Sequence, residues 1–131
     1  MNVAELSLCK ELYALSGWEP NNWFAGGDAQ DTVAVSSVVI QQQFKSGLLE
    51  PAYDLGYLLR KLPSFIYSEA YEQKAWLWLR KNIKDWNAWY WVHDPKYGEG
   101  EVVSEHGKSA ETPEDAACKL AIELFKQGVL K

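Results

Sequence analysis

The C-terminal part of the chain contains a complete helix signal, with a start, an apolar face and an end. Thr112 suits the N-cap, because its hydroxyl can accept a hydrogen bond from a free backbone N–H of the first turn. Pro113 fits the first helical position, and Glu114 and Asp115 favour the positive end of the helix dipole. Apolar residues then recur at helical spacing: Ala117, Leu120, Ala121, Leu124 and Phe125. Gly128 marks the end, so this stretch predicts a helix with one buried face.

Two further helices are expected upstream. Residues 2–16 place apolar side chains on one face, with Asn2 as the N-cap and Gly17 as the end. Residues 54–62 form a shorter helix with Asp54 as its cap. The predicted helices therefore lie at the start, the middle and the end of the chain.

Between the second and third helices the apolar period changes from helical to two. Residues 75–80 and 88–93 alternate, with tryptophans on one side and other apolar residues on the other, and residues 101–105 supply a further strand. Successive side chains of a strand point to opposite faces, so both faces of this sheet are apolar and both are expected to be covered. A helix over residues 69–86 competes, but strands are favoured because a helix would leave Leu77 off its apolar face.

These elements predict an α+β fold, a single three-layer α/β/α sandwich in which a small antiparallel β-sheet is flanked by helices. At 131 residues the chain has the length of one domain, so residues 1–131 are expected to form a single globular domain. Residues 17–50 are interpreted as an irregular, loop-rich insertion. Within it, Thr32–Ile40 fits a strand and Ser36–Phe44 fits a short helix, and periodicity does not choose between them.

Three segments together carry a resemblance to a known group of proteins. Residues 51–63, PAYDLGYLLRKLP, precede the predicted sheet, and residues 111–117, ETPEDAA, open a closing helix that ends in FKQGVL. The opening ELYALSGW at residues 11–18 fits the same pattern. This order is similar to small bacteriophage and prophage proteins, some of which are grouped as a phage ABA-sandwich domain. The resemblance implies a sheet between helices and a mobile-element origin, and it supplies no catalytic residue.

The charge and the apolar content of the chain limit the cellular locations and the partners that are expected. The net charge is −5, and residues 99–115, with six acidic residues and one lysine, account for all of it. A general nucleic-acid binder usually has the opposite sign, so double-stranded nucleic acid is not expected as a partner. No apolar run is long enough to span a bilayer, and the N-terminus lacks the features of a secretory signal. We expect a protein of the bacterial host cytoplasm, with Cys9 and Cys118 as buried thiols.

The chain offers little for catalysis. If the turn after the second strand centres near Tyr97, His93 pairs with Glu101 and His106 lies near Ala88, too far apart to share a metal. No nucleophile motif, phosphate-binding glycine loop or metalloprotease histidine pair is found. The sequence therefore predicts a protein that is not an enzyme and that uses no cofactor or metal.

Aromatic and acidic residues give the candidate binding site. Tryptophans beside cations are typical of single-strand binding, but rings at strand spacing are usually buried, and burial under a helical layer is the favoured interpretation. Acidic patches steer basic partners. The candidate binding residues are Trp18, Trp23, Asp28, Trp89, Trp91, Glu99, Glu101 and Glu105.

The leading functional hypothesis is a phage- or prophage-derived accessory protein that binds a host or phage macromolecule, with a protein as the expected partner. Inhibition of a bacterial defence system is one form of this hypothesis, by analogy. The alternative is a protein that binds a small molecule or nucleotide in a tryptophan-lined pocket between the sheet and residues 17–50.

Overall fold

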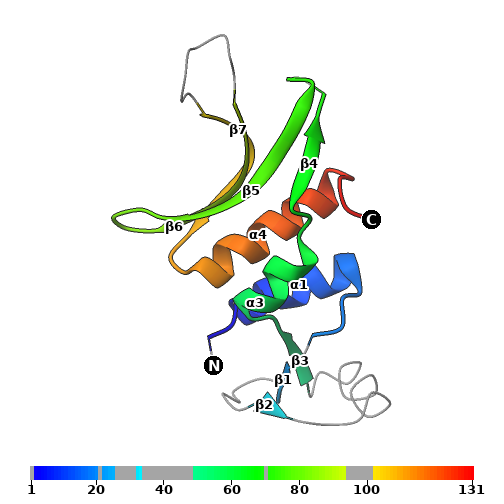
Figure 1. Cartoon of the computed structure of the whole chain (residues 1–131). Helices are drawn as coiled ribbons and strands as arrows, with labels where there is room; N and C mark the ends of the chain where they lie inside the picture. The colour runs from blue at the N-terminus through cyan, green and yellow to red at the C-terminus, as the bar shows by residue number, and fades with distance from the viewer. Residues whose placement is uncertain (1, 21, 26–31, 34–48, 70, 94–101) are drawn as a thin grey trace.

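The computed structural model describes residues 2–20, 22–25, 32–33, 49–69, 71–93 and 102–131 (Figure 1). The helices of this part are α1 (Leu6–Ser16), α3 (Leu55–Lys61) and α4 (Pro113–Lys126). A small sheet contains β1 (Asn22–Ala25), β2 (Thr32–Val33) and β3 (Leu49–Ala52). A larger one contains β4 (Phe65–Ser68), β5 (Gln73–Lys81), β6 (Trp86–His93) and β7 (Val102–Ala110). The fold is α+β, as the sequence predicted.

The larger sheet is antiparallel throughout, with strand order β4-β5-β6-β7. In β5 and β6, Trp76 lies opposite Trp91 and Trp78 lies opposite Trp89. Because residues directly opposite each other share a face, this register gathers four tryptophans on one side of the sheet. We call this side the outer face. The inner face carries Ala75, Leu77, Leu79, Ala88 and Tyr90.

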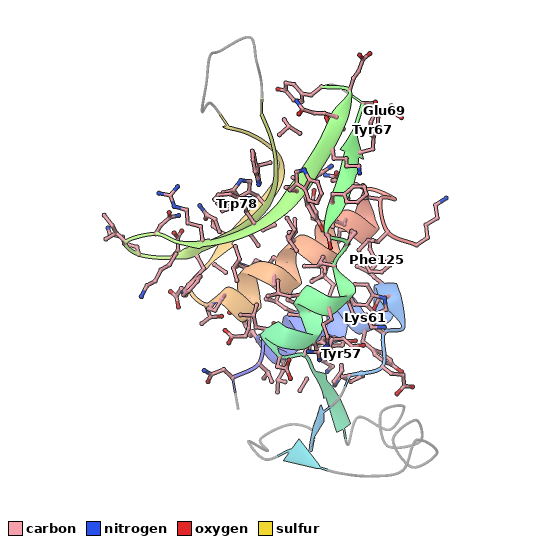
Figure 2. The ribbon with its side chains drawn as sticks, in the orientation of Figure 1. Tyr57, Lys61, Tyr67, Glu69, Trp78 and Phe125 are labelled. Atoms are coloured by element: carbon pink, nitrogen blue, oxygen red, sulfur yellow. The ribbon has the colours of Figure 1, made fainter. Side chains whose placement is uncertain are left out.

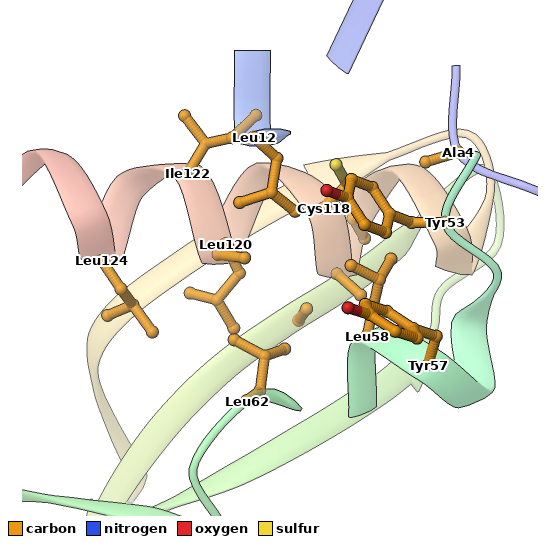
Figure 3. Close-up of a cluster of buried hydrophobic side chains, with 14 of the residues drawn as sticks. Ala4, Leu12, Tyr53, Tyr57, Leu58, Leu62, Cys118, Leu120, Ile122 and Leu124 are labelled. Atoms are coloured by element: carbon orange, nitrogen blue, oxygen red, sulfur yellow. The ribbon is translucent and has the colours of Figure 1, made fainter. Parts of the chain in front are cut away.

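Helix α4 lies against the inner face of the sheet, and α1 and α3 pack on the opposite side of α4 (Figure 1). Figure 3 shows the resulting core, which includes Leu12 of α1, Leu58 of α3, and Leu120 and Leu124 of α4. In the described part of the chain, helices therefore cover one face of the sheet. The three-layer sandwich with helices on both faces is not confirmed.

The predicted caps of the two later helices are confirmed. Thr112 Oγ1 accepts a hydrogen bond of 3.1 Å from the backbone N–H of Asp115, and Pro113 opens α4. Asp54 Oδ1 accepts one of 2.8 Å from the backbone N–H of Tyr57. Gly17 and Gly128 have φ angles of +66° and +77°, the left-handed region that glycine tolerates after a helix.

The predicted start of the first helix is wrong. Helix α1 begins at Leu6 rather than at Asn2, because Val3 forms a bridge with Asp54 and the Ala4 N–H donates to Tyr53 O at 2.9 Å. The Glu5 N–H donates to Asp115 Oδ1 at 2.6 Å. The beginning of α1 is therefore fixed by distant segments instead of by a local cap.

Strands β5 and β6 confirm the alternation and exclude a helix over residues 69–86. The sequence did not predict β4, and β7 extends to Ala110 instead of ending at residue 105. The expected register was also wrong, because His93 pairs with Val102 and His106 with Tyr90. An irregularity between Tyr90 and Trp91 shifts the pairing there, as a β-bulge does.

Residues 17–50 are only partly described. Strand β1 pairs antiparallel with β2 and with β3, so part of this segment is a sheet. Strand β2 covers the first two residues of Thr32–Ile40, and residues 34–48 lie outside the described part of the chain. The choice between a strand and a helix there stays a prediction.

Both cysteines are buried and are not in a disulfide, which confirms the expected buried thiols. A hydrogen bond with Cys9, followed by burial, raises the pKa of the Cys118 thiol. A thiol held in this protonated state is a poor nucleophile, so the pair is part of the core.

Three buried tyrosine hydroxyls donate hydrogen bonds to backbone carbonyl oxygens outside the helices. Tyr53 and Tyr90 donate to the carbonyl oxygens of Trp18 and Pro63, each at 2.6 Å, and Tyr57 donates to that of Glu19. Burial raises the pKa of all three phenols above the ordinary value of 10.0. Burial disfavours the charged phenolate, so the folded state keeps these phenols protonated.

We predict that the free energy of unfolding falls as the pH rises above about 10. An unfolded tyrosine ionises there, whereas Tyr53 and Tyr90 in the folded state do not, so the folded state then binds more protons than the unfolded state. Each such group contributes a slope of about 1.4 kcal/mol per pH unit. Urea unfolding across this range should show a shallower fall for Tyr90→Phe than for the unchanged protein. Equal slopes, or full phenolate absorbance in the folded protein near pH 10, would contradict this.

A pair of glycine variants tests the helix assignments. Gly56 lies within α3, and a Cβ there would meet the end of the Arg60 side chain, with Nη1 at 3.3 Å. Gly56→Ala should therefore raise the free energy of unfolding by roughly 0.5–1 kcal/mol, because alanine loses less entropy in a helix. Gly17→Ala should lower it, since a positive φ strains alanine even in open space. Chemical denaturation measures both, and a destabilised Gly56→Ala would show that α3 is not built as described.

Candidate binding surface on the outer face of the sheet

The centre of the outer face is a row of four side chains along β5. Lys74, Trp76, Trp78 and Arg80 are all exposed, at positions that share a face of the strand. Successive members are roughly 7 Å apart, because a strand rises about 3.4 Å per residue. The row therefore presents a cation, two indole rings and a second cation in a line.

Strand β6 adds two half-buried rings beside this row. The ring centroid of Trp78 lies 5.2 Å from that of Trp91, with an edge-to-face angle of 82°, and 6.0 Å from that of Trp89. Such contacts between rings stabilise their relative orientation. Trp78 is thus held from the side while its exposed surface faces away from α4 (Figure 2).

Strand β4 extends the aromatic surface on the other side of the row. The ring centroid of Phe65 lies 5.2 Å from that of Trp76, and Tyr67 lies opposite Lys74. The Lys74 ammonium is 4.4 Å from the centroid of Phe65, a cation–π contact that places the charge on this face. The outer face therefore gathers aromatic rings from three neighbouring strands and cations from β5.

The exposure of these rings decides between the two interpretations of the tryptophans. Trp76 and Trp78 are 44% and 47% exposed, Phe65 is 40% and Tyr67 is 62% exposed. Large apolar side chains gathered on one exposed face are typical of an interaction site. In the described part of the chain, the outer face is thus a surface rather than the expected core under a helical layer.

One polar atom on this face lacks a partner. The indole Nε1–H of Trp91 is buried and has no hydrogen-bond acceptor among the described residues. A buried donor of this kind costs about 1–3 kcal/mol relative to a satisfied one. It lies beside the β6–β7 irregularity, where the backbone pairing is already disturbed.

The charge of the surface differs from that of the whole chain. Residues 73–93, which form β5, β6 and their connection, hold four cations and one acid, a net charge of +3 in a chain of −5. Strands β4, β5 and β6 contain no aspartate or glutamate. Lys74 and Arg80 on the outer face and Lys84 at the end of the hairpin are exposed, so this half of the sheet favours an anionic ligand.

The candidate binding residues predicted from the sequence do not all lie on the outer face. Trp89 and Trp91 lie on the outer face, whereas Trp18 packs edge-on against Phe125 at 5.1 Å beside the helices. Trp23 lies in β1 and Glu105 in β7, where the backbone alone is described. Asp28, Glu99 and Glu101 lie outside the described residues.

The structure adds site residues that are not among the candidate binding residues predicted from the sequence. These are Phe65, Tyr67, Lys74, Trp76, Trp78 and Arg80. The alternation in residues 74–80 indicated that these side chains share one face of a strand. It did not indicate which face of the strand α4 would cover.

Elsewhere, a hollow lies between α1, α4 and β7, with a volume of about 470 Å³. Two ion pairs line it, Lys108 with Glu123 at 3.4 Å and Lys126 with Glu11 at 2.8 Å. These pairs join four of the charged side chains of the lining to each other, and Lys119 is the other charged side chain there. Among the described residues, no group of three or more metal-ligating side chains is gathered in one place.

Comparison with protein families, with curated proteins and with solved structures finds no match for this chain. Within the described residues, no helix is both long enough and apolar enough to cross a membrane. The outer face is therefore the feature of this chain that bears on function.

Proposed function

We propose that this chain is a non-enzymatic accessory protein that binds a macromolecule through the outer face of its sheet. The observation that carries the proposal is the pair of exposed tryptophans, Trp76 and Trp78, between the exposed cations Lys74 and Arg80. Tryptophan and arginine dominate the energetics of binding surfaces, because large rings and guanidinium groups give much contact area at low entropic cost. A face with both types supports binding better than it supports catalysis.

The proposed origin is phage or prophage, and the proposed location is the cytoplasm of a bacterial host. Both follow from the resemblance carried by residues 51–63 and 111–130. A protein of the host or of the phage is the partner expected from the sequence, and inhibition of a defence enzyme is one form that such binding could take by analogy. Binding through the outer face does not depend on this origin.

We propose that a bound partner completes the three-layer arrangement. Helices cover the inner face, and the outer face of the described strands has no second helical layer. A bound partner would supply that layer and remove Trp76 and Trp78 from water, which releases apolar hydration free energy.

The alternative is a small molecule or nucleotide held by the tryptophans alone, because the described strands of residues 17–50 lie beyond α1 and α3, away from the sheet, and do not form the pocket expected from the sequence (Figure 1). Trp78 and Trp91 meet at 82°, so their rings form two walls of a corner rather than a flat surface. A planar ligand could stack on one ring while its edge meets the other. The outer face would then hold one compact ligand instead of an extended partner.

We predict that the double variant Trp76→Ala, Trp78→Ala loses capture of the partner from a host lysate. The matched control is Leu15→Ala, which also removes an exposed apolar side chain, but from α1. Far-ultraviolet circular dichroism should show that both variants keep the fold, and the double variant should melt at a lower temperature because it loses the ring contacts with Phe65, Trp89 and Trp91. Equal capture by the original protein and the double variant would overturn the proposed surface.

A further inference from the structure

We propose that the outer face binds single-stranded nucleic acid, with bases stacked on Trp76 and Trp78 and phosphates contacted by Lys74 and Arg80. This inference rests on the proposed function and names the class of its partner. It places nucleic acid ahead of the protein partner expected from the sequence.

The first argument is the geometry of the β5 row. Proteins that hold single strands combine aromatic platforms for successive bases with cations that follow the backbone. The row from Lys74 to Arg80 has this arrangement, with two neighbouring rings between two charges. The rings are fixed laterally by Phe65 on one side and by Trp91 on the other, so their exposed surfaces are pre-oriented.

The second argument is charge complementarity. The strands that form the outer face, β4 to β6, contain no acid; residues 65–93 as a whole hold four cations and three acids, and the acids Glu69, Glu72 and Asp85 all lie in the turns between the strands. Lys84 in the connection of the hairpin adds an exposed cation beyond Arg80, whereas Lys81 lies opposite Trp86 on the inner-face side of β5. A basic or neutral protein partner would not use this charge, whereas a polyphosphate backbone would release counterions on binding.

The third argument concerns the form of the nucleic acid. The rings can stack only on bases that are unpaired and free of their own neighbours, which a duplex does not present. The strands β5 and β6 curl away from α4 in Figure 1, so that the outer face is concave in this view. A flexible single strand can follow such a face more readily than a stiff duplex.

A second copy of the chain fits this surface less well. A two-fold dimer places the same patch against itself. The described strands would then bring Lys74 and Arg80 toward the same cations of the partner copy, with no acid of β4, β5 or β6 to balance them. Like charges facing each other disfavour that pairing.

Fluorescence anisotropy with labelled oligonucleotides tests the proposal. The probes are oligo(dT) and oligo(U) of about 12 nucleotides, within the site size of such domains, and a duplex of the same length. The single strands should bind with quenching of tryptophan fluorescence, and the duplex should bind at least tenfold more weakly. The logarithm of the binding constant should fall with the logarithm of salt with a slope of about −1.4, for two phosphate contacts on a single strand.

Single variants separate the roles of the four residues. Trp76→Ala and Trp78→Ala should each weaken binding by roughly fivefold to a hundredfold and leave the salt slope unchanged. Lys74→Gln and Arg80→Gln should each reduce the magnitude of the slope by about 0.7. The matched control Arg60→Gln removes an exposed cation from α3 and should change neither quantity. Melting curves confirm that each variant is folded.

Three results would overturn the inference. They are no binding of either oligonucleotide, binding that is the same for single strand and duplex, and binding that is indifferent to Trp76 and Trp78. If the oligonucleotides fail while partner capture from the lysate still requires these tryptophans, the surface is correct and the partner is a protein. If the double variant changes the sedimentation mass, a second copy covers the face. If neither oligonucleotides nor capture depends on the tryptophans, the proposed function fails as well.

Discussion

The fold depends on the packing of α4 between the sheet and the other two helices. Its small side chains, Ala116, Ala117 and Ala121, are fully buried and allow neighbouring backbones to approach closely. Leu120 and Leu124 fill the apolar space between these close backbone contacts. A helix that is buried on more than one side holds several elements at once, so the inner face of the sheet, α1 and α3 are all positioned by the same fourteen residues.

This arrangement makes the two faces of the sheet unequal. The inner face meets α4, whereas the outer face carries Trp76 and Trp78 at close to half exposure. Leaving such rings in water gives up the free energy that their burial would contribute to folding. Their position between two cations, in a hairpin whose charge is opposite to that of the chain, is therefore better explained by binding than by stability.

The sequence predicted what local chemistry determines. The caps at Thr112 and Asp54 and the glycine stops of α1 and α4 use groups within a few residues of each other, and all are confirmed. The start of α1 could not be predicted in this way, because its backbone donors reach Tyr53 and Asp115 far along the chain. The alternation in β5 identified a strand but not its buried side, since both sides are apolar and only tertiary packing decides which one α4 covers. The sequence therefore contained the row of the outer face, but it did not indicate that these side chains are exposed.

Contacts in the core also determine the arrangement of the aromatic rings on the outer face. Tyr90 faces inward, and its hydroxyl donates to the carbonyl oxygen of Pro63, at the point where the chain leaves α3. One residue later, Ser64 O accepts a hydrogen bond of 2.9 Å from the backbone N–H of Leu77, which starts the pairing of β4 with β5. That register places Phe65 beside Trp76. A buried hydrogen bond on the inner side thus fixes a ring contact on the outer side, and the aromatic surface is pre-organised before any partner arrives, which lowers the entropic cost of binding.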